Sequence, residues 1–198
     1  SAIALGLGRP APADRITVGH IGCGRKGGYR NVYFGSLLQE FVGNPAAQSL
    51  AVCDVDKTYL DNSKGYVDQQ YGNRDCAAYR DFRDLLARDD LDAVLITTGS
   101  NWHALLSIYA AKAGKDVYCE KPCTKNIAES LALAETFRRT GRVYQAGTQR
   151  RNGSNFVFAI ELARQARLGR LQSVHACCGG GTGMSGWGRA QPEPPQEQ

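Results

Sequence analysis

The sequence has no apolar run long enough to cross a bilayer, so it predicts no membrane span. It also has little concentrated charge. Lys and Arg number 24 against 19 for Asp and Glu, and apart from three adjacent basic pairs they are spread along the chain. Because a nucleic-acid surface normally carries a denser basic patch, we expect no nucleic acid as a partner. The phosphates of a cofactor, or an anionic substrate, account equally well for local positive charge.

Cysteine is present, but not in a pattern that predicts cross-links or a metal site. The chain has seven cysteines, an odd number, and several fall inside apolar runs, where cysteine acts as a small hydrophobe. We therefore expect no disulfide framework. Cys119 with Cys123, and Cys177 with Cys178, would suit a metal, but no second pair or histidine lies at zinc-finger spacing. We expect no metal ion.

The first fourteen residues differ from the rest of the chain. Residues 1–8 are small and apolar, residues 9–14 are polar, and neither an initiating methionine nor a positively charged leader is present. The pattern resembles the end of an export signal whose beginning is missing, and a disordered extension is the alternative. We expect an exported, periplasmic protein, with a cytoplasmic one as the alternative.

The central motif follows the first apolar run. Residues 16–21 predict a buried strand that leads directly into Gly22-Cys23-Gly24-Arg25-Lys26-Gly27. In a dinucleotide-binding loop the first glycine permits the tight turn, the second lets the backbone approach a pyrophosphate, and the third lets the next helix pack closely. Apolar residues at helical spacing follow over 34–42, so strand, turn and helix come in the required order. The alternative is an ordinary strand-to-helix turn.

A second strand ends in the acidic residue that this motif requires. The run over 50–53 is apolar and is followed by Asp54, whose carboxylate suits the hydroxyl groups of a ribose. Asp54 lies 30 residues beyond Gly24, against the roughly 20 usual for the motif, and a long first helix accounts for the excess. Because a carboxylate repels a 2′-phosphate, NAD is the expected cofactor, while Arg25 and Lys57 leave NADP possible.

Strands and helices alternate along most of the chain. Expected strands cover 16–21, 50–53, 76–79, 92–98, 116–119 and 142–146, and expected helices cover 57–71, 82–87, 102–113 and 126–139. This alternation predicts an α/β fold with a doubly wound, mainly parallel sheet, whose ligands sit beyond the carboxyl ends of the strands. We assign residues 15–150 to a dinucleotide-binding domain. Residues 151–198 would be a linking helix, the first strand of an incomplete second domain at 171–177, and a tail.

Four segments resemble one known family. They are the glycine loop, Ala51-Val52-Cys53-Asp54, Asn101-Trp102-His103-Ala104, and the run from Ala113 to Pro122. Together they resemble the Gfo/Idh/MocA oxidoreductases, named after glucose-fructose oxidoreductase and inositol dehydrogenase, over residues 16–177. The most specific part is Glu120-Lys121-Pro122 at a strand end, and the segment over 147–152 resembles exported members.

The resemblance implies hydride transfer between a nicotinamide cofactor and a secondary alcohol of a sugar or cyclitol. In family terms Lys121 reaches the reacting oxygen, Glu120 sits near the nicotinamide ribose, and Pro122, often a cis proline in relatives, fixes the turn. An ammonium at that place stabilises negative charge developing on the substrate oxygen. Without the resemblance, Lys121 would be interpreted as a solvated strand end.

The same resemblance implies further contacts around the cofactor and the substrate. Thr98, Asn101 and His103 would line the cofactor's nicotinamide side, while Gln149 and Arg151 would lie at the mouth of the cleft, Arg151 toward the substrate. Simpler roles are open for two of them. His103, at the first turn of a helix, is also typical of a cap or packing residue, and Arg151 of a solvated turn.

Two departures from the family leave the function open. Gly99 stands where the family often has proline, and the second domain, which in relatives supplies most of the substrate pocket and the subunit contacts, stops after its first strand. The leading hypothesis is an NAD(P)-dependent oxidoreductase that acts as a homo-oligomer at full length. The alternatives are an NAD-dependent glycoside hydrolase of the same family, which oxidises and re-reduces the sugar transiently, and a non-catalytic nucleotide-binding module.

Overall fold

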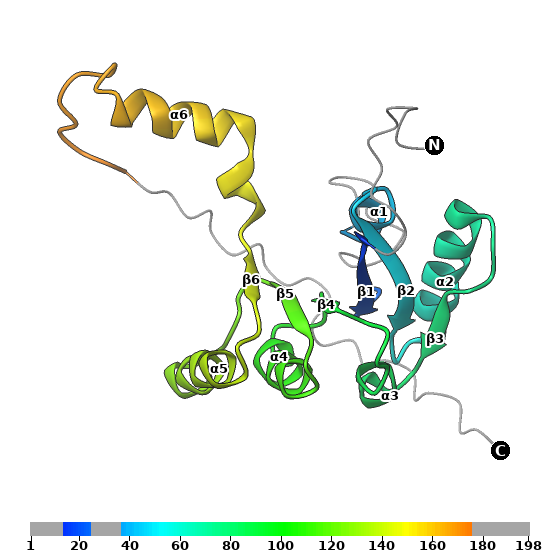
Figure 1. Cartoon of the computed structure of the whole chain (residues 1–198). Helices are drawn as coiled ribbons and strands as arrows, with labels where there is room; N and C mark the ends of the chain where they lie inside the picture. Colours follow the sequence, from blue (N-terminus) through cyan, green and yellow to red (C-terminus); the bar gives the residue numbers. More distant parts are fainter. Residues whose placement is uncertain (1–13, 25–36, 176–198) are drawn as a thin grey trace, which may run out of the picture. The chain divides into compact units, whose positions relative to one another are not determined.

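The computed structural model describes residues 14–24 and 37–175, which form an α/β fold (Figure 1). The strands are β1 (Ile16–Ile21), β2 (Ala47–Cys53), β3 (Ala77–Tyr79), β4 (Ala93–Ile96), β5 (Asp116–Glu120) and β6 (Tyr144–Gly147). The helices are α1 (Leu37–Val42), α2 (Lys57–Tyr71), α3 (Phe82–Leu86), α4 (His103–Lys112), α5 (Ile127–Thr140) and α6 (Ser154–Arg164), with a 3-10 turn at Gln149–Asn152. The chain divides into two compact units, residues 1–149 and residues 150–198.

The six strands form one sheet in the order β3-β2-β1-β4-β5-β6. Every neighbouring pair is parallel, so the predicted doubly wound sheet is confirmed. From β1 the chain winds outward to β3, then returns to place β4 on the other side of β1 and winds outward to β6. Such a reversal leaves a crevice at the carboxyl ends of the strands, which is where ligands of this kind of sheet bind.

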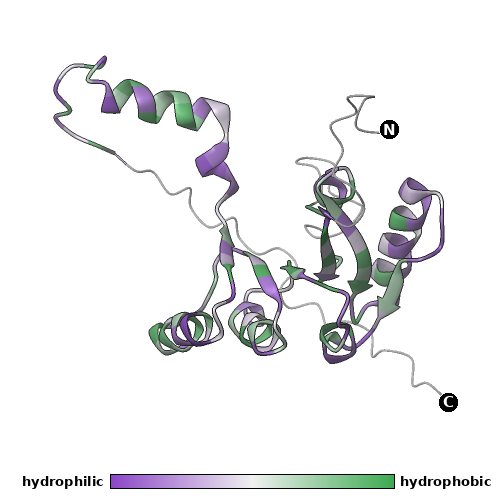
Figure 2. Cartoon of the chain, viewed as in Figure 1, coloured by the Kyte–Doolittle hydropathy of each residue, from purple (hydrophilic) through white to green (hydrophobic). Residues whose placement is uncertain are grey.

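Each face of the sheet packs against its own helices, as a doubly wound sheet requires. On one face Leu106 of α4 and Leu133 of α5 share an apolar cluster with Val94 of β4. On the other face Leu38 of α1 and Val67 of α2 belong to a second cluster. Figure 2 shows polar and apolar colours side by side on α2 and α5, so both helices are amphipathic and turn only one side to the sheet.

Short-range signals in the sequence set the ends of the helices. Asp81 caps α3 by accepting from the backbone N–H of Arg83 at 2.9 Å. Asn126 caps α5 by accepting from the N–H of Glu129 at 2.8 Å, and the Glu129 side chain reaches back to donors that precede the helix. The helix ends at Gly141, whose φ of 66° lies in the left-handed region that favours glycine.

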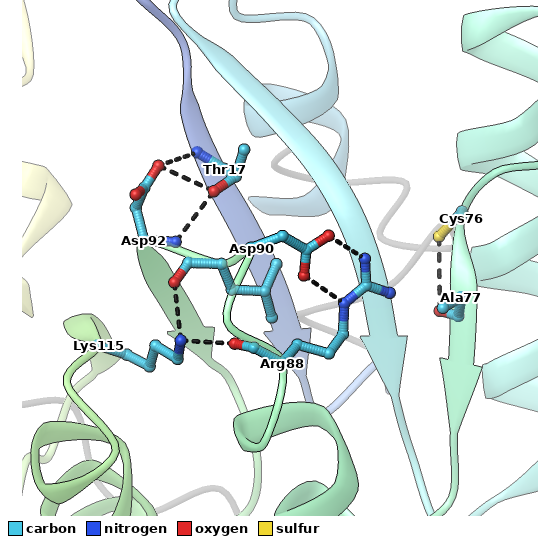
Figure 3. Close-up of polar contacts among 8 residues, drawn as sticks. Thr17, Cys76, Ala77, Arg88, Asp90, Asp92 and Lys115 are labelled. Atoms are coloured by element: carbon cyan, nitrogen blue, oxygen red, sulfur yellow. Dashed lines mark hydrogen bonds and ion pairs between the residues drawn. The ribbon is translucent and has the colours of Figure 1, made fainter. Parts of the chain in front are cut away.

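Polar groups tie down the loops at the amino ends of the strands (Figure 3). The Asp92 carboxylate accepts from the backbone N–H and the hydroxyl of Thr17, both at 2.8 Å. The Lys115 ammonium, in a side chain only 5% exposed, donates to the backbone carbonyls of Arg88 at 2.6 Å and Leu91 at 2.9 Å. These contacts lie at the edge of the sheet away from the crevice, so their role is stability.

The second unit contains the predicted amphipathic helix, α6, and none of its residues is buried. Phe158 on this helix is 60% exposed. The prediction of a strand over 171–177 is wrong for the part that the structure describes, because residues 171–175 have no regular structure. A strand needs a neighbour to pair with, and the described residues of this unit contain no second strand. Residues 176–177, like residues 1–13 of the predicted leader, lie outside the described part.

None of the described helices combines the length and the apolar character that a membrane span needs. Within the described ranges, no three His, Cys, Asp or Glu side chains gather closely enough to hold a metal ion. The five described cysteines are free thiols, four buried and one half-buried.

Candidate functional site

A cleft of about 740 Å³ opens at the carboxyl edge of the sheet, between the loops that follow β1, β2, β3 and β4. Its size is within the roughly 300–1,000 Å³ typical of small-molecule sites. Five of the residues that the sequence singled out line it: Gly22, Gly24, Asp54, Thr98 and Asn101. The cleft is therefore the candidate site, at the point where the winding of the sheet reverses.

Gly22 and Gly24 of the loop after β1 are glycines for different reasons. Gly22 has a φ of 91°, and a Cβ on it would lie 2.7 Å from the backbone nitrogen of Thr98. The backbone N–H of Gly22 donates to the carbonyl of Cys53 at 2.9 Å, and the Thr97 hydroxyl donates to the carbonyl of Gly22. Among residues 14–24 and 37–175, nothing lies within 4 Å of a Cβ placed on Gly24. Gly22 is thus required by the protein's own packing, whereas Gly24 borders open space in the cleft.

Asp54 ties the end of β2 to the glycine loop. One carboxylate oxygen accepts from the backbone N–H of Cys23 at 2.6 Å, and the other accepts from the N–H of Asp56 at 2.8 Å. Because each carboxylate oxygen has two lone pairs, the half-buried side chain still has acceptors for hydroxyl groups in the cleft. The Cys23 thiol is buried in the core, where burial and the charge of Asp54 raise its pKa to about 12. Cys23 therefore supports the site through its backbone N–H, not through thiol chemistry.

Side chains that the sequence did not single out complete the walls of the cleft. Tyr59, on the first turn of α2, and Trp102, just before α4, both line it and are partly exposed. Asp81 and Arg83 line it after β3 and form an ion pair, and hydrogen bonds from Arg83 lower the pKa of Asp81 to about 2. Flat aromatic surfaces suit the rings of a dinucleotide, and ion-paired side chains keep the wall polar. The signal that would have found all four is their position just beyond the end of a parallel strand.

The turn after β5 that carries Lys121 is held by a buried carboxylate. Glu120 is only 3% exposed; one of its oxygens accepts from the backbone N–H of Lys121 at 3.1 Å, and the other accepts from the side-chain amide of Gln149. The peptide bond between Lys121 and Pro122 is cis. The Lys121 side chain is exposed. Glu120 and Gln149, predicted near the cofactor, thus contact each other and the backbone of the lysine turn.

His103 links this turn to the wall of the cleft. Its side chain is 2% exposed, its Nδ1 lies 2.7 Å from the carbonyl oxygen of Pro122, and its Nε2 lies 3.0 Å from the carbonyl oxygen of Thr98. Both ring nitrogens therefore face backbone acceptors instead of open space. The structure brings His103 to the loops around the cleft, but not onto the surface of the cleft itself.

The predicted site residues thus fall into groups. Five line the cleft, and Glu120, Lys121, His103 and Gln149 surround the neighbouring turn. Cys23 lies behind Asp54. Arg25, Lys26 and Gly27 lie outside the described residues, so their predicted roles in cofactor binding stay predictions. Arg151 belongs to the second compact unit and also stays a prediction.

Residues 16–148 match the model of a protein family described as an oxidoreductase family with an NAD-binding Rossmann fold. The match covers all six strands of the sheet and both the glycine loop and the lysine turn.

Individual relatives extend this result. A glycosyl hydrolase family 109 protein of Shewanella pealeana is 30% identical over 162 residues, which are 80% of this chain and 34% of that protein. The scyllo-inositol dehydrogenase of Lactobacillus casei, solved with NAD(H) and scyllo-inositol bound, is 25% identical with a TM-score of 0.65, and the match covers 78% of this chain and 42% of that one. The WlbA dehydrogenase of Chromobacterium violaceum, solved with NADH and UDP-GlcNAcA, is 26% identical with a TM-score of 0.64, covering 82% and 43%. The chain spans about a third of the length of the curated relatives it matches.

Proposed function

Because this chain belongs to the oxidoreductase family with an NAD-binding Rossmann fold, we propose that it is the nucleotide-binding half of an enzyme that transfers hydride between NAD and a secondary alcohol of a sugar or cyclitol. The solved relatives support the substrate class, since one was solved with scyllo-inositol and another with a sugar nucleotide. A carboxylate on the ribose side of the cleft favours NAD over NADP.

The observation that carries the proposal is the arrangement of Gly22, Gly24 and Asp54 at one end of the cleft. A Cβ on Gly24 would project into space that no atom of the described residues fills, which leaves room for a diphosphate against the backbone. Asp54 keeps free lone pairs for a ribose while its bonds to backbone N–H groups fix its position. The residues present therefore fit a dinucleotide.

In the proposed reaction the nicotinamide ring of bound NAD accepts or supplies the hydride. The contribution of this chain is to hold and orient. Asp54 fixes the adenosine end, and the wall formed by Thr98 and Asn101 borders the cleft on the β4 side. The Lys121 ammonium would donate a hydrogen bond to the substrate carbonyl oxygen and stabilise the negative charge that develops on it as the hydride arrives. In the reverse direction it would stabilise the alkoxide that forms when the hydroxyl loses its proton and from which the hydride leaves. Glu120, bound to the backbone of Lys121, fixes the turn from which that amine extends.

The relatives named as family 109 glycosyl hydrolases favour a second candidate, a hydrolase that uses NAD without net oxidation of its substrate. The two candidates use the same nucleotide site. They differ in outcome, because a dehydrogenase accumulates NADH with a free sugar or cyclitol, whereas a hydrolase releases a leaving group from a glycoside and leaves the amount of NADH unchanged. A non-catalytic nucleotide-binding module would do neither.

Cofactor binding is tested by titrating NADH and NADPH into the 198-residue chain and following nicotinamide fluorescence. Gly24→Val should weaken NADH binding by about tenfold or more, equivalent to about 1.4 kcal/mol or more, because its side chain enters space left for the diphosphate, where a Cβ meets no atom of the described residues within 4 Å. Lys121→Ala, the matched control, should bind NADH as the natural chain does. Equal binding by the Gly24 variant would contradict the site.

The reaction is tested on the full-length protein with NAD and a panel of free sugars, cyclitols and nitrophenyl glycosides. Absorbance from NADH with a free polyol supports the dehydrogenase, and nitrophenol release at constant NADH supports the hydrolase. If NADH binds but neither NADH formation nor nitrophenol release is observed, the result supports the nucleotide-binding module. The same full-length material, analysed by sedimentation, tests the proposed homo-oligomer.

A further inference from the structure

We propose that His103 is a positioning residue: its Nδ1–H holds the carbonyl of Pro122 and so fixes the turn from which Lys121 extends toward the cofactor. The inference rests on the proposed function, since it concerns where the amine sits relative to bound NADH. It assigns His103 an indirect role in place of the direct nicotinamide contact expected from the sequence.

The geometry around the ring carries the inference. Both ring nitrogens face carbonyl oxygens, which can only accept, and a neutral ring can donate to only one of them. The Nδ1 contact with Pro122 O, at 2.7 Å against 3.0 Å for the Nε2 contact, is the shorter, and we therefore place the hydrogen on Nδ1. The acceptor belongs to the residue that directly follows Lys121. With the ring 2% exposed, water cannot replace this bond if the side chain is changed.

The other end of the ring reaches the wall of the cleft. Nε2 lies 3.0 Å from the carbonyl oxygen of Thr98. The backbone nitrogen of Thr98 lies against Gly22, so closely that a Cβ on Gly22 would approach it to 2.7 Å. The ring therefore sits between the turn of Lys121 and a residue packed on the glycine loop. A shift of the β4 loop on cofactor binding would reach Lys121 through this ring.

The lysine turn is held on its second side by an independent contact. The backbone N–H of Lys121 donates to the Glu120 carboxylate, and that carboxylate also accepts from Gln149. The turn is thus fixed at two successive residues, at the N–H of Lys121 by Glu120 and at the carbonyl of Pro122 by His103. The backbone of His103 is held as well, because the Ser107 hydroxyl donates to the His103 carbonyl at 2.6 Å.

Two substitutions with the same functional group separate this role from simple packing. An Asn side chain places its amide N–H close to the position of the histidine Nδ1, and a Gln side chain places it close to that of Nε2. His103→Asn keeps a donor for Pro122, whereas His103→Gln keeps a donor for Thr98. A packing role would make both variants alike, or would make Gln, the larger side chain, the better substitute.

The experiment follows Lys121 directly. Lysines of the 198-residue chain and of both variants are dimethylated with ¹³C-formaldehyde, and the signal missing from Lys121→Arg identifies the Lys121 methyl groups. On addition of NADH this signal should shift in the natural chain and in His103→Asn, and its shift should fall by at least about half in His103→Gln. NADH affinity, which in the proposed function depends on Gly24 and Asp54, should stay within about threefold in all three proteins.

Equal shifts in the natural chain and in His103→Gln would overturn the inference, as would loss of the shift in both variants. Failure of the natural chain to bind NADH would instead refute the proposed function. A measurement on the natural chain covers the case in which a variant does not fold. Ring ¹⁵N spectra should show a hydrogen on Nδ1 of His103, and a hydrogen on Nε2 alone would overturn the inference.

Discussion

Acid should destabilise the fold through one buried histidine. His20 lies in the middle of the sheet, on β1, and its Nε2 contacts the Ser49 hydroxyl at 2.8 Å, while its buried Nδ1 has no hydrogen-bond partner in the described part of the chain. A charged ring would need a partner at both nitrogens. Burial accordingly lowers the pKa of His20 from 6.5 to about 3. The native state therefore keeps this ring neutral at any pH at which enzymes are normally assayed.

The size of the effect follows from the pKa difference between the two states. Above pH 6.5 the ring is neutral in both the folded and the unfolded chain, so its protonation does not change the free energy of unfolding. Between pH 6.5 and about 3 only the unfolded chain binds the proton, and the free energy of unfolding falls by about 1.4 kcal/mol per pH unit. At pH 5 the loss is about 2 kcal/mol, and it stops growing below the folded pKa. For a unit of this size that corresponds to a fall in Tm of roughly 4–8 °C.

The assay is urea unfolding followed by circular dichroism at pH 7.5, 6 and 5. A double variant, His20→Phe with Ser49→Ala, removes the titrating ring and its partner together while keeping an aromatic ring edge-on to Phe41. The difference in unfolding free energy between natural chain and variant should change by about 2 kcal/mol, in favour of the variant, from pH 7.5 to 5. His175→Gln, at an exposed position, is the control and should not change the pH dependence. Parallel curves for the natural chain and the double variant would refute the reasoning.

Three further predictions follow from single contacts. Lys115→Met should lower the free energy of unfolding by about 2–4 kcal/mol, since it removes the donor to two backbone carbonyls, those of Arg88 and Leu91. Lys112→Met, at an exposed position, is the control. Equal melting temperatures for the two variants would contradict the prediction. Gly22→Ala should lower the free energy of unfolding by about 3 kcal/mol or more, because its Cβ meets the Thr98 backbone at a positive φ. The free energy of unfolding of Gly24→Ala should lie within about 1 kcal/mol of that of the natural chain. Asp54→Asn should weaken the binding of both NADH and NADPH, because the amide nitrogen of asparagine cannot accept a hydrogen bond, so one of the two backbone N–H groups held by Asp54 loses its acceptor. Tighter NADPH binding at an unchanged Tm would show instead that the carboxylate selects the cofactor and does not hold the loop.

Much of the fold could be predicted because short-range patterns specify it. The run over 92–98 is apolar without alternation, as a strand covered on both faces requires, and in β4 the successive residues Val94, Leu95 and Ile96 are all buried. Caps at Asp81 and Asn126 were predictable because a capping side chain binds N–H groups two or three residues away. The glycine loop and Asp54 were predictable in type, since both follow strand ends. Their hydrogen bond, over 31 residues of sequence, was not.

The contacts around Lys121 could not be predicted, because they join segments that meet only in the folded sheet. Glu120 and Gln149 are 29 residues apart and meet because β5 and β6 are neighbours. The position of His103 at the start of a helix says nothing about the direction of its ring. The strand expected over 171–177 failed for a related reason. Alternation of apolar residues is a local signal, whereas the pairing that makes a strand is not.

The glycine end of the cleft and the lysine turn are held by different chemical groups, so substitutions affect them differently. The glycine end of the cleft is formed by the backbone of Gly22, Cys23 and Thr98 and by one side chain, that of Asp54, so a new Cβ or a change at Asp54 disturbs it. The lysine turn is fixed by two buried side chains, Glu120 and His103, so it is sensitive to their substitution. Thr98 belongs to both parts, with its nitrogen against the glycine loop and its carbonyl facing His103. We therefore expect occupancy of the cleft to shift the amine, as the proposed role of His103 requires, and we expect the Lys121→Ala chain to keep its affinity for NADH.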